Sequence, residues 1–170
     1  MFFFFILCCA SKKVHTERYK VTPPGQSWKA VESGGADHAW YNKDLGGVIY
    51  IDSNCEKQFE DRSLKDSLNS LTAGIAIGQP LAEQTLFVDG REGLMVIRKG
   101  RLDGVDVQIS AANLAKNQCL YDFIYIAPPH KFSYGLQPFV STVHSFQSKE
   151  HPSDGFTKDS DPATSAPKTQ

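Results

Sequence analysis

Residues 93–109 read GLMVIRKGRLDGVDVQI, and this stretch decides the fold class. Two runs rich in aliphatic and β-branched residues flank Asp103-Gly104, a dipeptide that strongly favours a tight β-hairpin. A short hairpin joins antiparallel neighbours, because parallel strands require a long crossover connection. The stretch therefore predicts that the domain is built on an antiparallel sheet.

Other strand-like runs lie on both sides of this hairpin. They cover residues 28–31, 38–42, 48–52, 85–88 and 119–126. The last run ends at Pro128-Pro129, because proline cannot donate a hydrogen bond to a strand ladder. We therefore expect an antiparallel sheet of about six strands.

Two segments change from the strand period to a helical period. The first apolar stripe is Leu64, Leu68, Leu71 and Ile75, and the second is Leu136, Phe139, Val140, Val143 and Phe146. Ser63 is a fitting N-cap for the first helix. Pro138 predicts that the second helix begins close to it, because proline is tolerated in a first turn. Two principal helices packed on an antiparallel sheet make an α+β domain.

The composition fits one globular domain and excludes several classes of protein. The chain has 170 residues, and its 18 Lys and Arg against 19 Asp and Glu give a net charge of -1. No global basic field is therefore available to hold nucleic acid. The 41% apolar and 22% charged fractions exclude wholesale disorder and a multi-span membrane protein.

The first ten residues, MFFFFILCCA, resemble the apolar region of a secretory signal. As a helix they would span only about 15 Å, half of a bilayer core, so they predict no transmembrane helix. A cysteine directly after such a run resembles a bacterial lipobox, and Cys9 fits better than Cys8 because a small residue precedes the lipidated position. No Lys or Arg precedes the run, so we expect a signal that is truncated at its start. Another export route, an uncleaved anchor and a cytosolic protein with a misassigned start remain alternatives.

The ends of the chain are expected to flank a single domain. We assign residues 1–9 to the signal and lipobox-like segment, 10–26 to a polar tether, 27–148 to one α+β domain, and 149–170 to a disordered tail. Tether and tail are too polar to bury the surface that would order them. Ala10 follows Cys9, where an Asp would favour retention at the inner membrane, so the outer membrane facing the periplasm is expected.

Several short motifs from Trp28 to Phe146 carry a resemblance to a known group. They are Trp28-Lys29, Asp37-x-Ala39, Gly46-Gly47-x-Ile49, Cys55, the Leu64/Leu68/Leu71 stripe, the hexapeptide 89–94, Asp103-Gly104-Val105, the Cys119-x-Tyr121-Asp122-Phe123-x-Tyr125-x-Ala127-Pro128-Pro129 segment, and Phe139/Phe146. The chain resembles bacterial envelope lipoproteins, mostly from deltaproteobacteria. Its arrangement is similar to the α/β/α sandwich of PsbP-like proteins. The resemblance implies a small extracytoplasmic module and no reaction.

Cys55 and Cys119 are the two thiols of the predicted domain, and each lies near the end of a strand. An exported protein meets an oxidising compartment, which favours a disulfide between them. Such a bridge would stabilise the fold by on the order of 4 kcal/mol in the chain-entropy model. The alternative is two buried free cysteines that behave as small apolar residues. No Cys or His pair has the spacing of zinc ligands, so we expect no metal.

Two further groups are candidates for a special role. Asp122 interrupts an apolar strand and would be costly to bury alone, so we expect it to find Arg91, backbone N–H groups or a turn. Of these, a structural ion pair with Arg91 is the favoured interpretation. Tyr121, Phe123 and Tyr125 alternate on one face of the last strand. They are core residues if helices cover both faces of the sheet, and a candidate binding face if one side is open.

The sequence contains no recognisable catalytic frame, because its histidines are scattered and none lies beside a nucleophile. We therefore expect a non-enzymatic envelope lipoprotein that binds the membrane through its anchor and docks an envelope protein or supports an assembly. A carrier of a small apolar ligand, held between sheet and helix, is the first alternative. An unrecognised enzyme is the second. No cofactor and no nucleic-acid partner are expected.

Overall fold

The structure, a computed structural model, describes residues 16–55 and 63–149. Its elements in chain order are a 3-10 helix η1 (Thr16–Arg18), β1 (Tyr19–Lys20), β2 (Lys29–Ala30), β3 (His38–Asn42), β4 (Gly47–Asn54), α1 (Leu64–Leu71), β5 (Ala76–Val88), β6 (Arg91–Leu102), β7 (Val105–Lys116), β8 (Cys119–Ala127), α2 (Phe132–His144) and β9 (Gln147–Ser148).

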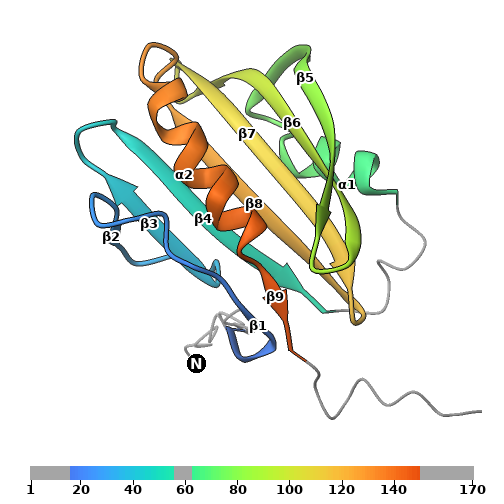
Figure 1. The fold of residues 1–170 in the computed structure, drawn as a ribbon. Coiled ribbons are helices and arrows are strands. Elements are labelled where there is room, and N and C mark those ends of the chain that lie inside the picture. The colour runs from blue at the N-terminus through green and yellow to red at the C-terminus, as the bar shows by residue number, and fades with distance from the viewer. Residues whose placement is uncertain (1–15, 56–62, 150–170) are drawn as a thin grey trace, which may run out of the picture.

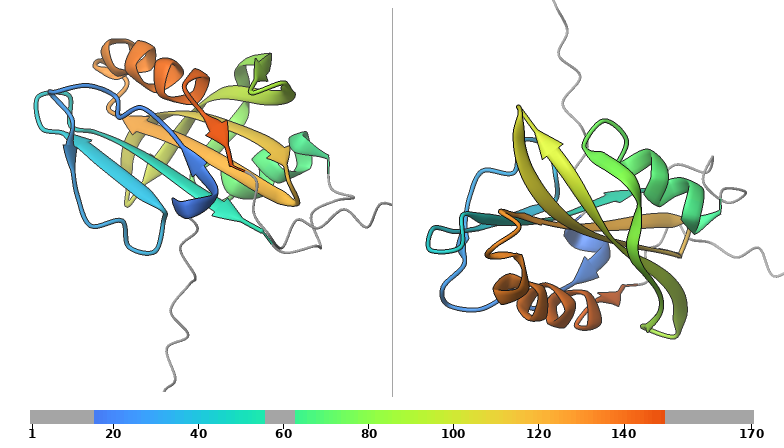
Figure 2. Two further views of the ribbon diagram at one scale, coloured as in Figure 1. Left: turned by 60° about the horizontal axis from the view of Figure 1, so that its bottom comes forward. Right: turned by 90° about the horizontal axis from the view of Figure 1, so that it is seen from above.

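Seven strands form the main antiparallel sheet, in the order β2-β3-β4-β8-β7-β6-β5. The two short strands β1 and β9 pair separately. Helix α2 packs on one face of the main sheet and α1 on the other, as the views in Figures 1 and 2 show. The predicted α+β architecture, with two principal helices on an antiparallel sheet, is confirmed.

The face under α2 holds an aromatic core. Alternate residues of β8 point to this face, so that Tyr121, Phe123 and Tyr125 meet Phe139 of α2 and Phe146 just after it. The Tyr121 and Phe146 ring centroids are 4.6 Å apart, and those of Tyr125 and Phe139 are 6.0 Å apart. Aromatic side chains bury large areas and contribute strongly to the stability of such a core.

Helix α2 begins at Phe132, so Pro138, which was predicted to lie in the first turn, lies well inside the helix. The stripe simply extends one turn further back, because Phe132 and Gly135 are buried as well. Gly135 leaves room for the Tyr125 hydroxyl, which donates to the Phe132 carbonyl at 3.0 Å. A Cβ at residue 135 would collide with that hydroxyl. The prediction of the helix was therefore right in its face and wrong in its start.

Helix α1 begins where the sequence predicts, but it ends at Leu71, one turn before Ile75, the last residue of the predicted stripe. Ser63 caps its N-terminus by accepting a hydrogen bond from the Asp66 backbone N–H at 3.1 Å. Leu68 is fully buried against aliphatic residues of the sheet, among them Val96 and Ile124. The chain then leaves the helix through Gly74, whose φ of +85° lies in the region that favours glycine.

The domain begins earlier in the chain than predicted. Tyr19, which was assigned to the tether, is 2% exposed and belongs to the aromatic core. Strand β1 pairs with β9, and the Thr22 N–H donates to Ser145 Oγ at 2.8 Å. Residues 16–26 are therefore part of the domain, because the Tyr19 ring, the β1–β9 pairing and the Thr22 bond attach this polar stretch to it. Residues 1–15 and 150–170 lie outside the described residues.

Candidate functional site

Strand β5 forms one edge of the main sheet, and it is unusually exposed for its length. It has 13 residues and pairs with β6 on its inner side. Within residues 16–55 and 63–149, no strand pairs with its outer side. Three large apolar side chains of β5 are exposed: Ile77 at 49%, Leu81 at 53% and Phe87 at 74%. A long open edge of this kind is a template for pairing with another chain.

The ladder between β5 and β6 is interrupted near its start. Ile77 pairs with Lys99, and pairing then resumes only at Ala82, which lies opposite Ile97. Residues 78–81 form the irregular segment, in which Gly78 has a φ of +70°. Proline at position 80 also removes a backbone donor. The segment bends away from regular pairing and leaves a hollow beside α1.

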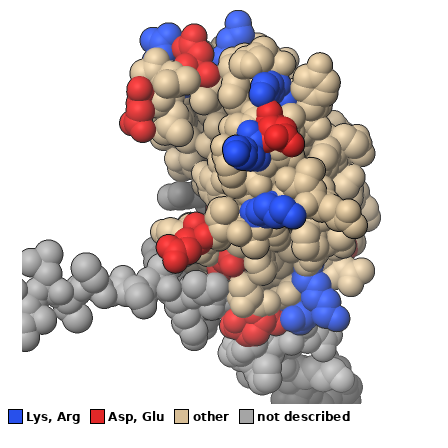
Figure 3. All heavy atoms as spheres, turned by 90° about the vertical axis from the view of Figure 1, so that its left-hand side faces the viewer, with Lys and Arg blue, Asp and Glu red and all other residues tan. Residues whose placement is uncertain are grey.

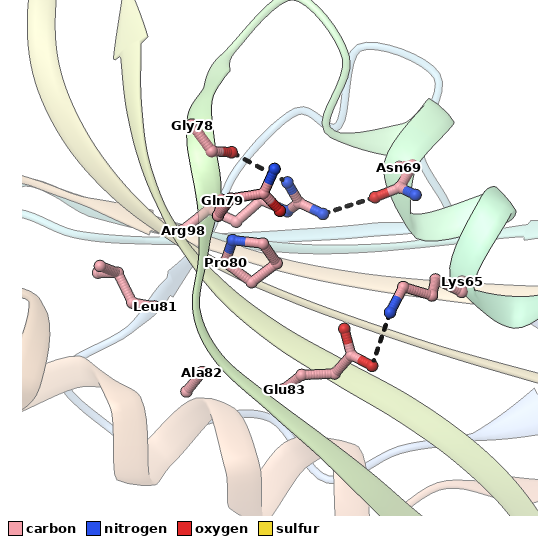
Figure 4. A pocket seen from close by; sticks show the side chains of 9 residues that line it. All are labelled: Lys65, Asn69, Gly78, Gln79, Pro80, Leu81, Ala82, Glu83 and Arg98. Carbon is pink, nitrogen blue, oxygen red and sulfur yellow. Dashed lines mark hydrogen bonds and ion pairs between the residues drawn. The ribbon is translucent and has the colours of Figure 1, made fainter.

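This hollow is the candidate site, and Figure 4 shows its lining residues. It has a volume of about 560 Å³ and lies between α1 and the irregular segment of β5. Lys65 and Asn69 come from α1, and Arg98 comes from β6. Glu83 lies near the start of the regularly paired part of β5. We call it the α1–β5 groove. Because α1 supplies two of its side chains, the N-cap that fixes α1 also fixes one wall of the groove.

Charged side chains of both signs line the α1–β5 groove. Lys65 Nζ lies 3.1 Å from Glu83 Oε1, in an exposed pair whose contribution to stability is about 1 kcal/mol or less. Arg98 Nη2 donates to Asn69 Oδ1 at 2.5 Å, and its Nη1 to the Gly78 carbonyl at 3.5 Å. These bonds leave part of the five-donor guanidinium unused. With two cations against one carboxylate, the groove favours a ligand that carries an acidic group.

A second hollow, of about 400 Å³, lies near the tip of the β6–β7 hairpin. Ile77, Val107 and Pro129 supply its apolar lining, together with the Arg101–Asp106 pair. Arg101 Nη2 lies 2.8 Å from Asp106 Oδ1, and both side chains are largely exposed. Lys99 also lines this hollow, so its charged residues, like those of the α1–β5 groove, sum to one excess positive charge. It is the smaller of the two hollows.

A buried polar cluster around Asp37 has a structural role. The Tyr19 hydroxyl donates to Asp37 Oδ2 at 3.0 Å, and Ser53 Oγ donates to the same atom at 2.5 Å. Burial raises the pKa of Tyr19, and the charge of Asp37 raises it further. Burial lowers the pKa of His38, which stacks on Trp40, while Asp37 opposes that change. The cluster thus holds the N-terminal segment against the sheet.

The predicted disulfide is present. Cys55 and Cys119 are bonded, with their Cα atoms 4.0 Å apart. They follow and precede the last paired residues of β4 and β8, where Asn54 lies opposite Leu120. The bridge therefore joins two neighbouring strands at the end of their ladder.

The predicted ion pair between Arg91 and Asp122 is wrong. Arg91 lies opposite Val88, whose side chain belongs to the core under α2. Asp122 shares the other face of the sheet with Ile124, which packs under α1. Side chains alternate between the two faces along a strand, so Arg91 and Asp122 lie on opposite faces of the sheet. They form no ion pair with each other. The local pattern around Arg91 does not assign its side chain to a face of the sheet.

The predicted candidate binding face of Tyr121, Phe123 and Tyr125 is also wrong. All three side chains are fully buried under α2 and Phe146. Burial raises the pKa of Tyr125 to about 12, opposed by the backbone of Gly135. The residues are core, as the covered-sheet alternative anticipated. Their rings fill the space between the sheet and α2, which is where the carrier alternative would hold an apolar ligand.

Other sequence predictions fall outside the described part of the chain or concern absences. Cys9 and Cys8, the candidate lipidation sites, lie outside the described residues. Across residues 16–55 and 63–149, no cluster of three His, Cys, Asp or Glu side chains could hold a metal ion. In the same ranges, no helix has the length and apolar character needed to cross a membrane.

Sequence reasoning missed the α1–β5 groove. A usable signal was nevertheless present, because Pro80 with Gly78 before an apolar run marks an irregular edge strand. The prediction placed a strand only at 85–88, whereas β5 begins at Ala76. A strand at 85–88 does not reach α1, so the sequence did not predict that Lys65, Glu83 and Arg98 lie together.

Comparisons with known proteins place the fold. No protein family and no curated protein sequence matches the chain. Among solved structures, cyanobacterial PsbP (CyanoP) from Synechocystis aligns with a TM-score of 0.56 and 13% identity over 81% of this chain and 91% of that chain. LpqN, involved in cell envelope biogenesis of Mycobacterium tuberculosis, aligns with a TM-score of 0.53 and 8% identity over 76% of this chain and 82% of that one.

A third structure, from Bacteroides thetaiotaomicron, has a TM-score of 0.54 and 8% identity, over 78% of this chain and 48% of that chain. At such low identities the likeness concerns the fold alone. The similarity to CyanoP, together with two helices on opposite faces of an antiparallel sheet, shows that the chain has the PsbP-like α+β fold.

Proposed function

We propose that this chain is a non-enzymatic accessory protein of the bacterial cell envelope, which docks an extended segment of a partner protein along the edge strand β5. The observation that carries the proposal is the open edge of β5 beside the α1–β5 groove. The edge supplies main-chain hydrogen bonds, and the groove supplies a pocket for one side chain of the partner. Edge pairing combined with side-chain pockets is a recurring way of recognising peptides.

The regular part of β5 suits the addition of a strand. From Ala82 to Val88 it pairs with β6 without interruption. Every second residue of such a strand directs its N–H and C=O away from the inner neighbour. Phe87 stands exposed at the far end of this stretch and offers apolar contact area. A partner segment of about five to seven residues would match the paired length.

Charge complementarity favours an acidic side chain in that segment. Lys65 and Arg98 face Glu83 across the groove, so the charged lining residues sum to one excess positive charge. On the side of the molecule opposite β5, Figure 3 shows Lys and Arg interspersed with Asp and Glu. The partner is therefore an acidic, extended protein segment.

The proposed location is the envelope, with a lipid at Cys9 (or Cys8) as the anchor. The apolar N-terminus and the Cys55–Cys119 bridge support an oxidising, extracytoplasmic compartment. The similarity in fold to LpqN supports an envelope role. We place the chain among lipoproteins of the deltaproteobacterial type, at the outer membrane facing the periplasm.

Selection of peptides from a random displayed library on the full chain tests the docking proposal. We expect selected peptides to be extended and acidic, and to slow amide exchange in Ala82–Val88. Arg98→Gln should weaken their binding about tenfold, because a charge-assisted hydrogen bond contributes about 1.5 kcal/mol. Arg101→Gln, at the neutralised hairpin pair, is the matched control and should leave binding unchanged.

Two results would contradict the docking proposal. One is a library that yields no binder to the full chain. The other is a set of binders that protects amides outside β5 or binds Arg98→Gln as well as the unchanged protein.

Labelling with radioactive palmitate tests the anchor in bacteria that express the chain with a complete signal. The protein should incorporate label and partition into detergent. Replacement of both Cys8 and Cys9 by Ser should abolish the label and release the protein. An unlabelled, freely soluble protein with both cysteines intact would overturn the proposal.

A further inference from the structure

The two sulfurs of the disulfide differ in their surroundings. Cys55 is half-buried at the end of β4, whereas Cys119 is 3% exposed at the start of β8. An attacking thiolate needs a line of approach to the sulfur that it attacks. Cys55 is therefore the more accessible of the two cysteines, and attack on it would make Cys119 Sγ the leaving group.

A guanidinium lies beside the leaving sulfur. Arg18 Nη1 is 3.6 Å from Cys119 Sγ, across 101 positions of sequence. The backbone of Arg18 is held in place, because Tyr19 is anchored in the core and the Arg18 carbonyl accepts a hydrogen bond from the Lys149 N–H at 2.7 Å. A positive charge close to a sulfur stabilises the thiolate and lowers the pKa of the thiol.

We propose that Cys55–Cys119 is a thiol–disulfide exchange site, reduced by a protein dithiol that attacks Cys55, with Arg18 as the positioning residue that stabilises the departing Cys119 thiolate. The proposal is independent of the docking groove, which lies on the other face of the sheet.

The exchange balances as a two-electron transfer. A thiolate of the dithiol forms a bond to Cys55 Sγ, the Cys55–Cys119 bond breaks, and its electron pair remains on Cys119 Sγ beside Arg18. The second thiol of the dithiol then loses its proton and attacks the first sulfur of the dithiol, which is bonded to Cys55 Sγ. This attack displaces Cys55 as a thiolate. The dithiol ends as a disulfide, and both cysteines end reduced, with the two protons of the dithiol available to them.

The surrounding ladder allows both redox states to share one fold. Seven residue pairs join β4 to β8, from Val48 opposite Ile126 to Asn54 opposite Leu120. These pairs hold the strands together when the bridge beyond them is open. The cysteines of the reduced protein thus stay close enough to be oxidised again.

Reduction of the oxidised full chain by dithiothreitol, without denaturant, tests the exchange. We expect Arg18→Gln to slow the reduction about threefold or more and to raise the pKa of the Cys119 thiol by about 1, as read from the pH profile of alkylation. Arg18→Lys should restore most of both effects because it keeps the charge. Arg101→Gln, a change of the same kind in the β6–β7 hairpin, should alter neither.

Trapping with glutathione and mass spectrometry identifies the attacked sulfur. Glutathione bound to Cys55 supports the proposal, and glutathione bound to Cys119 overturns it. Reduction that proceeds only at the rate of global unfolding would also overturn it, since the bridge would then be structural. So would equal rates and equal thiol pKa values in Arg18→Gln and the unchanged protein.

Discussion

The two faces of the sheet bury different kinds of side chain, aromatic under α2 and aliphatic under α1. Under α2, rings from Tyr19, Tyr121, Phe123 and Tyr125 pack on Phe139 and Phe146. Under α1, the core is aliphatic and smaller, with Leu68 as its fully buried helical residue. Helix α1 is also short, at 8 residues against 13 for α2, and it leaves the start of β5 open.

This difference separates the face that stabilises the fold from the face that is proposed to bind a partner. The α2 face contains large, interlocked side chains and has little room for change. The α1 face contains fewer and smaller buried side chains, and its outer rim consists of Lys65, Asn69, Glu83 and Arg98. Stability should therefore respond most to substitutions under α2, and binding to substitutions at the rim of α1.

The largest loss of stability is expected from Phe139→Ala. The ring is fully buried between helix and sheet, 6.0 Å from that of Tyr125. Its removal leaves a cavity and should lower the free energy of unfolding by about 3–5 kcal/mol. Denaturant titration followed by circular dichroism measures the change. Tyr134→Ala, on the exposed side of the same helix, should alter it by less than about 0.5 kcal/mol.

The next largest loss is expected from Leu68→Ala, which tests the α1 face. The side chain is fully buried against aliphatic residues, and its truncation should cost about 2–5 kcal/mol. If the α1 face is the less densely packed of the two, this cost falls below that of Phe139→Ala in the same titration. A cost above that of Phe139→Ala would reverse the comparison.

A smaller, pH-dependent effect is expected at Asp89, in the turn between β5 and β6. Its carboxylate accepts hydrogen bonds from Lys116 Nζ at 2.7 Å and from the Ser148 N–H at 2.8 Å, which ties the edge strand to β7 and β9. Burial acts to raise the pKa of Asp89, but these hydrogen bonds and the Lys116 charge outweigh it. The pKa of Asp89 is thus lowered overall.

Because this pKa is lower in the folded protein, the stabilisation is fully present above the unfolded pKa of about 3.9. It disappears as the pH falls through the lower, folded value. Asp89→Asn should therefore cost about 1–3 kcal/mol at neutral pH and much less in strong acid. Thermal unfolding from pH 2 to pH 7 measures this, and a cost that does not change with pH would contradict the assignment.

The smallest effect is expected from Lys65→Ala at the rim of α1. Both members of the Lys65–Glu83 pair are exposed, so the loss should be below about 1 kcal/mol in the same titration. Binding of the selected acidic peptides should nevertheless weaken. A large loss of stability with unchanged binding would show that the rim is structural.

The sequence predicted most of the fold because its signals were local. The Asp103-Gly104 hairpin, the Ser63 cap and the stripe around Leu68 each act within a few residues, and each is found in the structure. The disulfide was also predicted, since two cysteines near strand ends leave few alternatives.

What the sequence could not provide was long-range geometry. The place of Tyr19 in the core depends on β1 meeting β9 at the other end of the domain. The face of Arg91 depends on strand register, which the local pattern does not fix. The α1–β5 groove depends on an irregular segment that brings Arg98 near α1, and no short motif encodes that meeting.

Site-specific photo-crosslinking in native membranes tests the central claim most directly, that the α1 side and its edge strand are the recognition surface. A photoreactive amino acid at Leu81, on the edge strand, is compared with one at Tyr134, on the outer side of α2; both positions are exposed. We predict a discrete protein adduct from position 81 and none from position 134. An adduct from position 134 with none from position 81 would contradict the account.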